Sequence, residues 1–292
     1  MRRTMPACLA ALFCLVPARA QSPEQKQATI EYLRSLQTRE GAFLPARGAA
    51  APGLRATSSA LRALKYFGGQ PRDRAACVPF VKACFDRDSG GFTDQPGKGK
   101  PDVATTAVGL MAVVELKMPA GDYEGPAVAD LGKHARNFEE IRIAVAGLEA
   151  VGKLPPQAIA WSDQLGRMRN EDGTYGKGDG KARATGGGVV ADLRLRENLT
   201  DPWREAVLKA LKPGQRADGG FGKEGAAGSD LETTYRVMRC FHMLKDVPDA
   251  GKVRGFLAKC RNEDGGYGVA PGQKSSVSGT YFAGIILHWL EK

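Results

Sequence analysis

Arg261-Asn262-Glu263-Asp264-Gly265-Gly266-Tyr267 is the stretch of this chain that decides its fold. Its first five residues occur a second time, unchanged, at 169–173, where a Thr-Tyr pair follows. Related Gly-aromatic turns end at Phe43, Phe92 and Phe221, so the aromatic residues lie 49, 83, 46 and 46 positions apart. A recurring period of this length indicates repeated structural units, and the step of 83 predicts a degenerate third unit near residues 122–152.

Each unit is predicted to be a helical hairpin. The first helix opens with Ser22 as N-cap, Pro23 at the first helical position and Gln25 as the capping-box partner. We expect Gly41 to end this helix, because glycine adopts the left-handed conformation at low cost. The second helix of each unit is poor in charge and rich in small and apolar residues, at 57–67, 103–116, 138–152, 184–197, 231–244 and 277–290.

An amphipathic helix followed by a mostly apolar one in every unit is typical of an outer ring of helices packed around an inner ring. No alternating strand pattern of useful length interrupts the series. The sequence therefore predicts an all-α fold: a single α/α toroid, or (α/α)6 barrel, of about six helical hairpins around a central cavity. The aromatic turn residues are expected to fill the seams between neighbouring hairpins.

The first twenty residues are predicted to be a signal peptide. Arg2 and Arg3 precede an apolar stretch that is too short for a permanent anchor, and Ala18-Arg19-Ala20 resembles a cleavage site. The toroid is then expected at 21–292, secreted into the periplasm or cell envelope, with no membrane span. Removing three arginines lowers the formal net charge from +10 only modestly, and the basic residues form no runs, so no nucleic-acid partner is expected.

Four cysteines remain in the predicted mature chain: Cys77, Cys84, Cys240 and Cys260. They include no CxxC pair, which argues against a cysteine zinc site. Cys84 and Cys260 occupy equivalent places in two repeats, as small core residues do. An oxidising compartment would permit a disulfide between Cys240 and Cys260, and the sequence leaves that question open.

The repeat resembles the prenyltransferase and squalene-cyclase family, most nearly the β subunit of type II protein geranylgeranyltransferase. The resemblance rests on the Gly-aromatic turns, on 80–84, on Asp230-Leu231-Glu232-Thr233-Thr234-Tyr235 and on Gly279-Thr280-Tyr281-Phe282. In that family an isoprenoid lies in an aromatic-lined cavity, and a zinc ion at the cavity rim activates a thiolate. The zinc ligands are the Asp and Cys of a D-x-C-Y motif and a later His.

The resemblance places Asp230 at the family's Asp, but Glu232 stands for the Cys, Gly279 for the His and Thr233 for the Tyr. The diphosphate segment G-R-x-x-K aligns with residues 223–227, where Glu224 and Ala227 replace Arg and Lys, and Thr185 stands for a diphosphate-binding His. One retained ligand cannot hold a catalytic zinc, which needs about three protein ligands and an open position. We therefore expect no cofactor. Squalene cyclases use D-x-D-D-T, which residues 230–234 match only in part.

The sequence thus favours a secreted toroid without the catalytic zinc site, which binds a lipid or isoprenoid in its cavity or a partner protein at its rim. Two enzymatic alternatives remain: an active divergent prenyltransferase, and a carbohydrate-active (α/α)6 enzyme that would pair Asp102 with Asp230 or Glu232. An apolar cavity would favour the lipid and a wide polar groove the sugar. The candidate rim residues precede or begin the inner helices: Arg55, Asp102, Arg183, Lys223, Asp230, Glu232 and Thr233.

Overall fold

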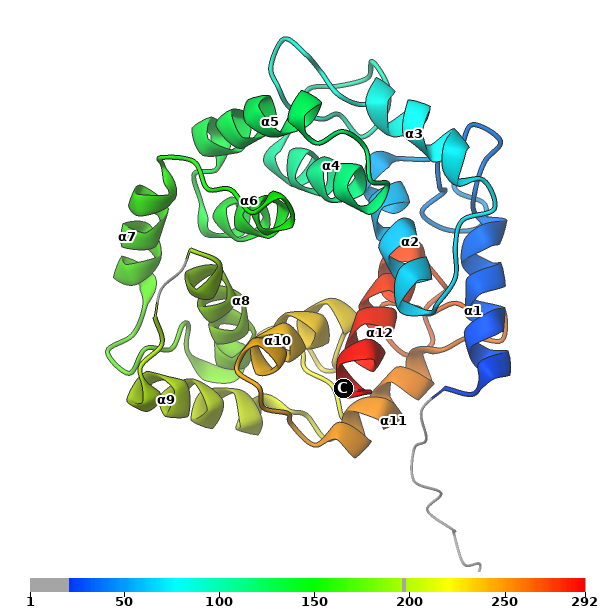
Figure 1. The fold of residues 1–292 in the computed structure, drawn as a ribbon. Helices are drawn as coiled ribbons and strands as arrows, with labels where there is room; N and C mark the ends of the chain where they lie inside the picture. The colour runs from blue at the N-terminus through cyan, green and yellow to red at the C-terminus, as the bar shows by residue number, and fades with distance from the viewer. Residues whose placement is uncertain (1–20, 196–197, 292) are drawn as a thin grey trace, which may run out of the picture.

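The computed structural model describes residues 21–195 and 198–291. Within these ranges the chain forms twelve α-helices, which alternate between an outer and an inner ring (Figure 1). The outer helices are α1 (Pro23–Ser35), α3 (Arg74–Ala83), α5 (Gly121–His134), α7 (Ala158–Met168), α9 (Asp201–Leu211) and α11 (Ala250–Cys260). The inner helices are α2 (Leu54–Tyr66), α4 (Val103–Glu115), α6 (Phe138–Val151), α8 (Lys181–Arg194), α10 (Leu231–Met243) and α12 (Val277–Leu290).

The all-α toroid predicted from the repeat is therefore confirmed, including the degenerate third hairpin, which consists of α5 and α6. Two short 3-10 helices, η1 (Gly178–Gly180) and η2 (Lys212–Gly214), lie in the fourth and fifth hairpins. One predicted boundary is wrong, because α1 ends at Ser35 and not at Gly41. Gly41 does adopt a left-handed φ of 83°, but in the following turn, where its Cα packs against the backbone of Ala76.

A buried threonine fixes each Gly-aromatic turn to the inner helix of its own hairpin. The backbone N–H of Tyr267 donates to Thr280 Oγ1 at 3.1 Å, and that of Phe221 donates to Thr234 Oγ1 at 3.0 Å. The same bond joins Phe43 to Thr57, Phe92 to Thr106, and Tyr175 to Thr185. Because all five aromatic residues are buried, this bond satisfies a backbone donor that water cannot reach.

Glycines in the inner helices accommodate the aromatic rings of the turns. A Cβ atom on Gly109 would lie 2.4 Å from the Phe92 ring, and one on Gly188 would lie 2.5 Å from the Tyr175 ring. These rings therefore pack against the inner helix of their own hairpin. The predicted contacts across the seams are made as well, because Tyr267 stacks on Phe67 and Tyr175 lies against Phe138 of a neighbouring hairpin. Residues 135–137 join α5 to α6 directly, so the third hairpin has no such turn.

The ring closes through hydrogen bonds that repeat between neighbouring hairpins. At two internal junctions the first residue of an inner helix donates its N–H to a loop carbonyl of the next hairpin: Leu54 donates to Asp94 and Leu231 donates to Val269, both at 2.8 Å. Val277 of the last hairpin donates to Pro45 of the first at 2.9 Å. The last junction thus has the same bond as two of the internal ones, and the hairpins form a closed circle (Figure 1).

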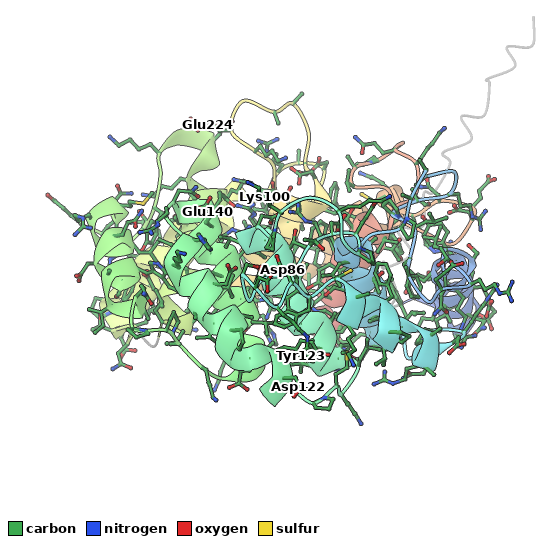
Figure 2. The ribbon with its side chains drawn as sticks, turned by 90° about the horizontal axis from the view of Figure 1, so that it is seen from above. Asp86, Lys100, Asp122, Tyr123, Glu140 and Glu224 are labelled. Atoms are coloured by element: carbon green, nitrogen blue, oxygen red, sulfur yellow. The ribbon has the colours of Figure 1, made fainter. Side chains whose placement is uncertain are left out.

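The long loops that precede the inner helices gather on one face of the ring. Glu224 and Lys100 mark this face in Figure 2, and Asp122 marks the opposite one. No helix within the described residues is long and apolar enough to cross a membrane. The predicted signal peptide lies outside the described residues.

Candidate functional site

The candidate rim residues lie where the inner helices begin, and the structure separates them into two groups. Arg55 and Asp102 form the first group, on α2 and α4. Arg55 Nη2 lies 2.7 Å from Asp102 Oδ2, and both side chains donate to or accept from the Thr105 hydroxyl. About half of each charged side chain is exposed, at 52% and 51%. This pair is an accessible ion pair at the mouth of the ring.

Asp102 and Asp230 are N-caps of α4 and α10 with the same geometry. Asp230 Oδ1 accepts from the backbone N–H of Thr233 at 2.8 Å, and Oδ2 accepts from the Thr233 hydroxyl at 2.8 Å. Asp102 binds Thr105 through the same two bonds at the same distances. Asp230 is the only residue retained from the family's metal ligands. Both of its carboxylate oxygens already accept hydrogen bonds from Thr233 at the start of helix α10.

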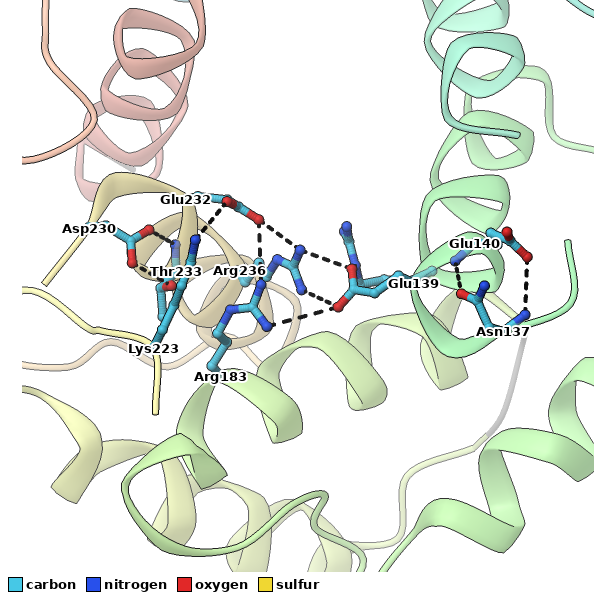
Figure 3. A network of polar contacts seen from close by, with 10 residues as sticks. Asn137, Glu139, Glu140, Arg183, Lys223, Asp230, Glu232, Thr233 and Arg236 are labelled. Atoms are coloured by element: carbon cyan, nitrogen blue, oxygen red, sulfur yellow. Dashed lines mark hydrogen bonds and ion pairs between the residues drawn. The ribbon is translucent and has the colours of Figure 1, made fainter. Parts of the chain in front are cut away.

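A network of charged side chains crosses the ring beside these caps (Figure 3). Arg236 of α10 makes a bidentate contact to Glu139 of α6, at 2.7 and 2.9 Å, and also donates to Glu232 at 2.7 Å. Arg183 of α8 lies between the two carboxylates, 3.5 Å from Glu232 and 3.9 Å from Glu139. Lys223 reaches Glu232 from the preceding loop at 3.7 Å.

Both carboxylates of this network are held in the ionised form. Burial would raise the pKa of Glu139, but the hydrogen bonds and charges of Arg236 and Arg142 outweigh it and lower the pKa to about 2. Burial likewise opposes the charges of Arg236, Lys223 and Arg183 at Glu232, whose pKa is also lowered. A pair of carboxylates used for glycoside hydrolysis needs one member protonated as general acid. Neither Glu139 nor Glu232 meets that requirement near neutral pH.

The positions of the family's other ligands are explained by packing. A Cβ atom on Gly279 would lie 2.5 Å from the carbonyl oxygen of Tyr267, so no histidine fits there without a backbone shift. Thr185, which the resemblance places at the position of a diphosphate-binding His, has a packing role. Thr185 is fully buried and exchanges hydrogen bonds with the backbone of Tyr175, so it does not face the cavity. Arg183, two residues earlier on α8, reaches the carboxylates of Glu232 and Glu139 instead.

The donor set does not fit the family's zinc. In the part of the chain that the structure describes, no three His, Cys, Asp or Glu side chains lie close enough to hold a metal ion. The histidines are dispersed: His134 pairs with buried Asp130 at 2.8 Å, His242 stacks on Trp289, and His288 packs on Tyr66. The four cysteines are buried and free, so the disulfide left open between Cys240 and Cys260 is not formed.

The structure places Arg183, Lys223 and Glu232 together at one mouth of the ring, whereas Glu139, Arg142 and Arg236 were not among the predicted residues. A signal for Arg236 was available, because it follows Glu232 by one helical turn, the spacing at which opposite charges pair on a helix. Asp102 and Glu232 belong to different groups, and Asp102 makes its ion pair with Arg55. The carboxylates considered for a carbohydrate-active enzyme each have partners of their own: Asp102 pairs with Arg55, Asp230 caps α10 and Glu232 pairs with Arg236.

Comparisons with known proteins agree with the architecture. The profile of the prenyltransferase alpha-alpha toroid domain matches residues 3–116, 70–144 and 141–291. A search of curated proteins gives no match. Among solved structures, Candida albicans protein geranylgeranyltransferase-I complexed with GGPP is similar with a TM-score of 0.65 and 14% identity, over 80% of this chain and 83% of that one.

Two further structures share the fold. The type II terpene cyclase MstE from Scytonema has a TM-score of 0.63 and 13% identity, over 91% of this chain and 96% of that one. A glycosidase variant in complex with glucose has a TM-score of 0.64 and 13% identity, over 92% and 95%. Identities this low show the common fold and no activity. The family profile spans nearly the whole chain, which therefore belongs to the prenyltransferase alpha-alpha toroid domain family.

Proposed function

We propose that this chain is an exported binding protein, a prenyltransferase-like toroid that uses no catalytic zinc and holds a partner protein at the rim described above. The observation that carries the proposal is the network of Glu139, Glu232 and Arg236, which lies beside the position of the family's metal centre. Asp230 caps helix α10, and Glu232 forms ion pairs with Arg236 and Arg183. These residues can present charge to a partner, but they offer no set of free metal ligands.

Charge at the rim supports a protein partner over a lipid. The side chains of Lys223, Glu139 and Arg55 are about half exposed, so a partner of complementary charge can reach them. An isoprenoid in the central cavity would instead have to pack among guanidinium and carboxylate groups. Its binding would remove water from these charged groups without offering them hydrogen bonds in return. The ionised state of both network carboxylates argues likewise against the carbohydrate-cleaving alternative.

The zinc part of the proposal is tested by calorimetric titration of Zn²⁺ into the wild type, Asp230→Ala and Asp102→Ala. The two variants lose equivalent caps, each with a stability cost of about 1 kcal/mol, but only Asp230 stands at a family ligand position. We expect no stoichiometric zinc binding in any of the three. Tight one-to-one binding that only Asp230→Ala abolishes would contradict the proposal and restore the prenyltransferase alternative.

The rim part is tested by photo-crosslinking in the native host. A photoreactive residue at position 224 lies on the loop face, and one at position 122 lies on the opposite face (Figure 2). Both natural residues are exposed and acidic, so the two positions are matched. A discrete protein adduct from position 224 alone would support the proposal. Adducts from position 122 alone, or from neither position, would contradict it. Export predicts that the protein isolated from this host begins at Gln21.

A further inference from the structure

A small cavity opens at the other mouth of the ring, among the C-terminal halves of the inner helices. It has a volume of about 220 Å³, and five inner helices contribute to its wall. The polar and charged lining residues are Arg62, Tyr66, Glu115, Glu149, Arg194, Tyr235 and Arg239. No residue of the rim network lines it, so it is a separate site.

The charges around this cavity do not balance. Glu149 forms an ion pair with Arg194 at 3.0 Å, and Glu115 forms one with Lys65 at 3.1 Å. Both carboxylates are thus already paired with other cations. Among the described residues, Arg62 and Arg239 have no ion pair with a carboxylate. Two guanidinium groups that cannot lose their protons therefore face the same small cavity.

Aromatic faces and soft acceptors hold these two guanidinium groups in place. Arg62 lies over the ring of Tyr281 at 4.6 Å, and Arg239 lies over the ring of Trp289 at 4.7 Å. Stacking leaves the N–H edge of a guanidinium available for hydrogen bonds. Arg62 donates to the Met111 sulfur, and the Nε of Arg239 is buried with no partner. That Nε is closed off from the cavity, but neither guanidinium has an anionic acceptor, so an anion bound by their other N–H groups would stabilise the site.

The potential in the cavity is positive enough to act on Tyr235. Burial alone would raise the pKa of this phenol, but the charges of Arg239, Arg62 and Arg194 outweigh burial and lower the pKa. From the surrounding helices Tyr281, Tyr66 and Glu149 also lie in this region. A site that favours a phenolate favours other small anions for the same electrostatic reason.

We propose that Arg62 and Arg239 form a binding site for the carboxylate or phosphate group of a small molecule. A guanidinium fork matches the two oxygens of either group. The volume is below the roughly 300–1,000 Å³ of pockets for drug-sized ligands, so the ligand is small. Tyr66 and Tyr235 supply aromatic walls for a short organic body. The site is independent of the proposed rim function, since it lies at the opposite mouth and shares no residue with it.

The test is titration of the full mature chain with inorganic phosphate and, separately, with benzoate, at constant ionic strength. Calorimetry measures affinity, and near-ultraviolet absorbance of tyrosinate measures the ionisation of Tyr235. The variants are Arg62→Gln and Arg239→Gln, with Arg169→Gln as the matched control. Arg169 also lies over an aromatic ring, that of Trp203 at 4.4 Å, but it belongs to the outer ring of helices.

We expect saturable binding of at least one probe, weakened about tenfold or more by each cavity substitution and unchanged by Arg169→Gln. Preference for benzoate would identify a carboxylate ligand, and preference for phosphate a phosphorylated one. The bound probe should also raise the pKa of Tyr235 in the wild type, because its negative charge offsets that of the arginines. This measurement tests the site even if the variants fail to fold. Absence of saturable binding by both probes, or an equal loss in Arg169→Gln, would overturn the proposal.

Discussion

Replacing Glu139 by glutamine tests the charged network most sharply. Glu139 is the acceptor on which Arg236, Arg142 and Arg183 converge, so the substitution leaves three cations around Glu232 alone. The pKa of Glu139 lies at about 2 against an ordinary 4.5, a difference of roughly 3 kcal/mol if fully expressed. Because 48% of the side chain is exposed, solvent screening should leave about 1–2 kcal/mol.

The pH dependence has a definite sign. A carboxyl group whose folded pKa is lowered contributes its stability above its ordinary pKa of 4.5 and loses it as pH falls towards 2. The wild type should therefore lose the contribution of Glu139 to its free energy of unfolding as the pH falls from 4.5 towards 2. In Glu139→Gln the free energy of unfolding should depend less on pH in this range. At neutral pH the variant should melt about 2–8 °C lower.

The assay is thermal and urea unfolding of both proteins at a series of pH values. Glu31→Gln is the control, since Glu31 is 50% exposed like Glu139 but pairs with a single arginine three residues away on its own helix. That substitution should change stability by less than about 0.5 kcal/mol. The reasoning is refuted if Glu139→Gln lowers the free energy of unfolding no more than Glu31→Gln does. It is also refuted if the wild type and Glu139→Gln lose the same stability between neutral pH and pH 3.

Three further predictions concern the repeat and its core. Gly279→Ala should destabilise the fold by about 1–3 kcal/mol because its Cβ would meet the carbonyl of Tyr267; a melting temperature equal to the wild type's would show that the backbone yields there. Thr234→Val should cost about 1–3 kcal/mol by leaving the N–H of Phe221 unsatisfied, whereas Thr234→Ser retains the hydroxyl and should cost less in denaturant unfolding. Burial raises the pKa values of the thiols of Cys77, Cys84, Cys240 and Cys260, so the native protein should react slowly with a thiol reagent. All four thiols should react once the protein is unfolded. A thiol that reacts rapidly in the native protein would contradict these buried positions.

The repeat made the architecture predictable, because each unit carries its own turn signal and its own pair of helices. The same repeat contained a further signal that was not used. A threonine follows the turn aromatic by ten to fourteen residues in five of the six hairpins, as Thr234 follows Phe221, and each one anchors its turn. That spacing alone places Thr185 in the core, where it is fully buried.

The candidate site was less predictable because its parts come from helices that are distant in sequence. Residues at helix N-termini, such as Asp230 and Arg183, could be assigned to one mouth from the hairpin order alone. The contact of Arg236 with Glu139 joins residues 97 positions apart and depends on the curvature of the ring. The arginines at the other mouth, Arg62 and Arg239, lie on helices predicted to be apolar, and only the closed ring brings them to one cavity.

Native mass spectrometry of the mature protein, isolated from its own cell envelope with metals and small molecules retained, tests the central claim most directly. We expect a chain that begins at Gln21, carries no stoichiometric zinc and no isoprenyl diphosphate, and is isolated with a bound partner chain. A one-to-one zinc adduct, or a retained isoprenyl diphosphate, would contradict the proposed binding function and indicate an active prenyltransferase instead.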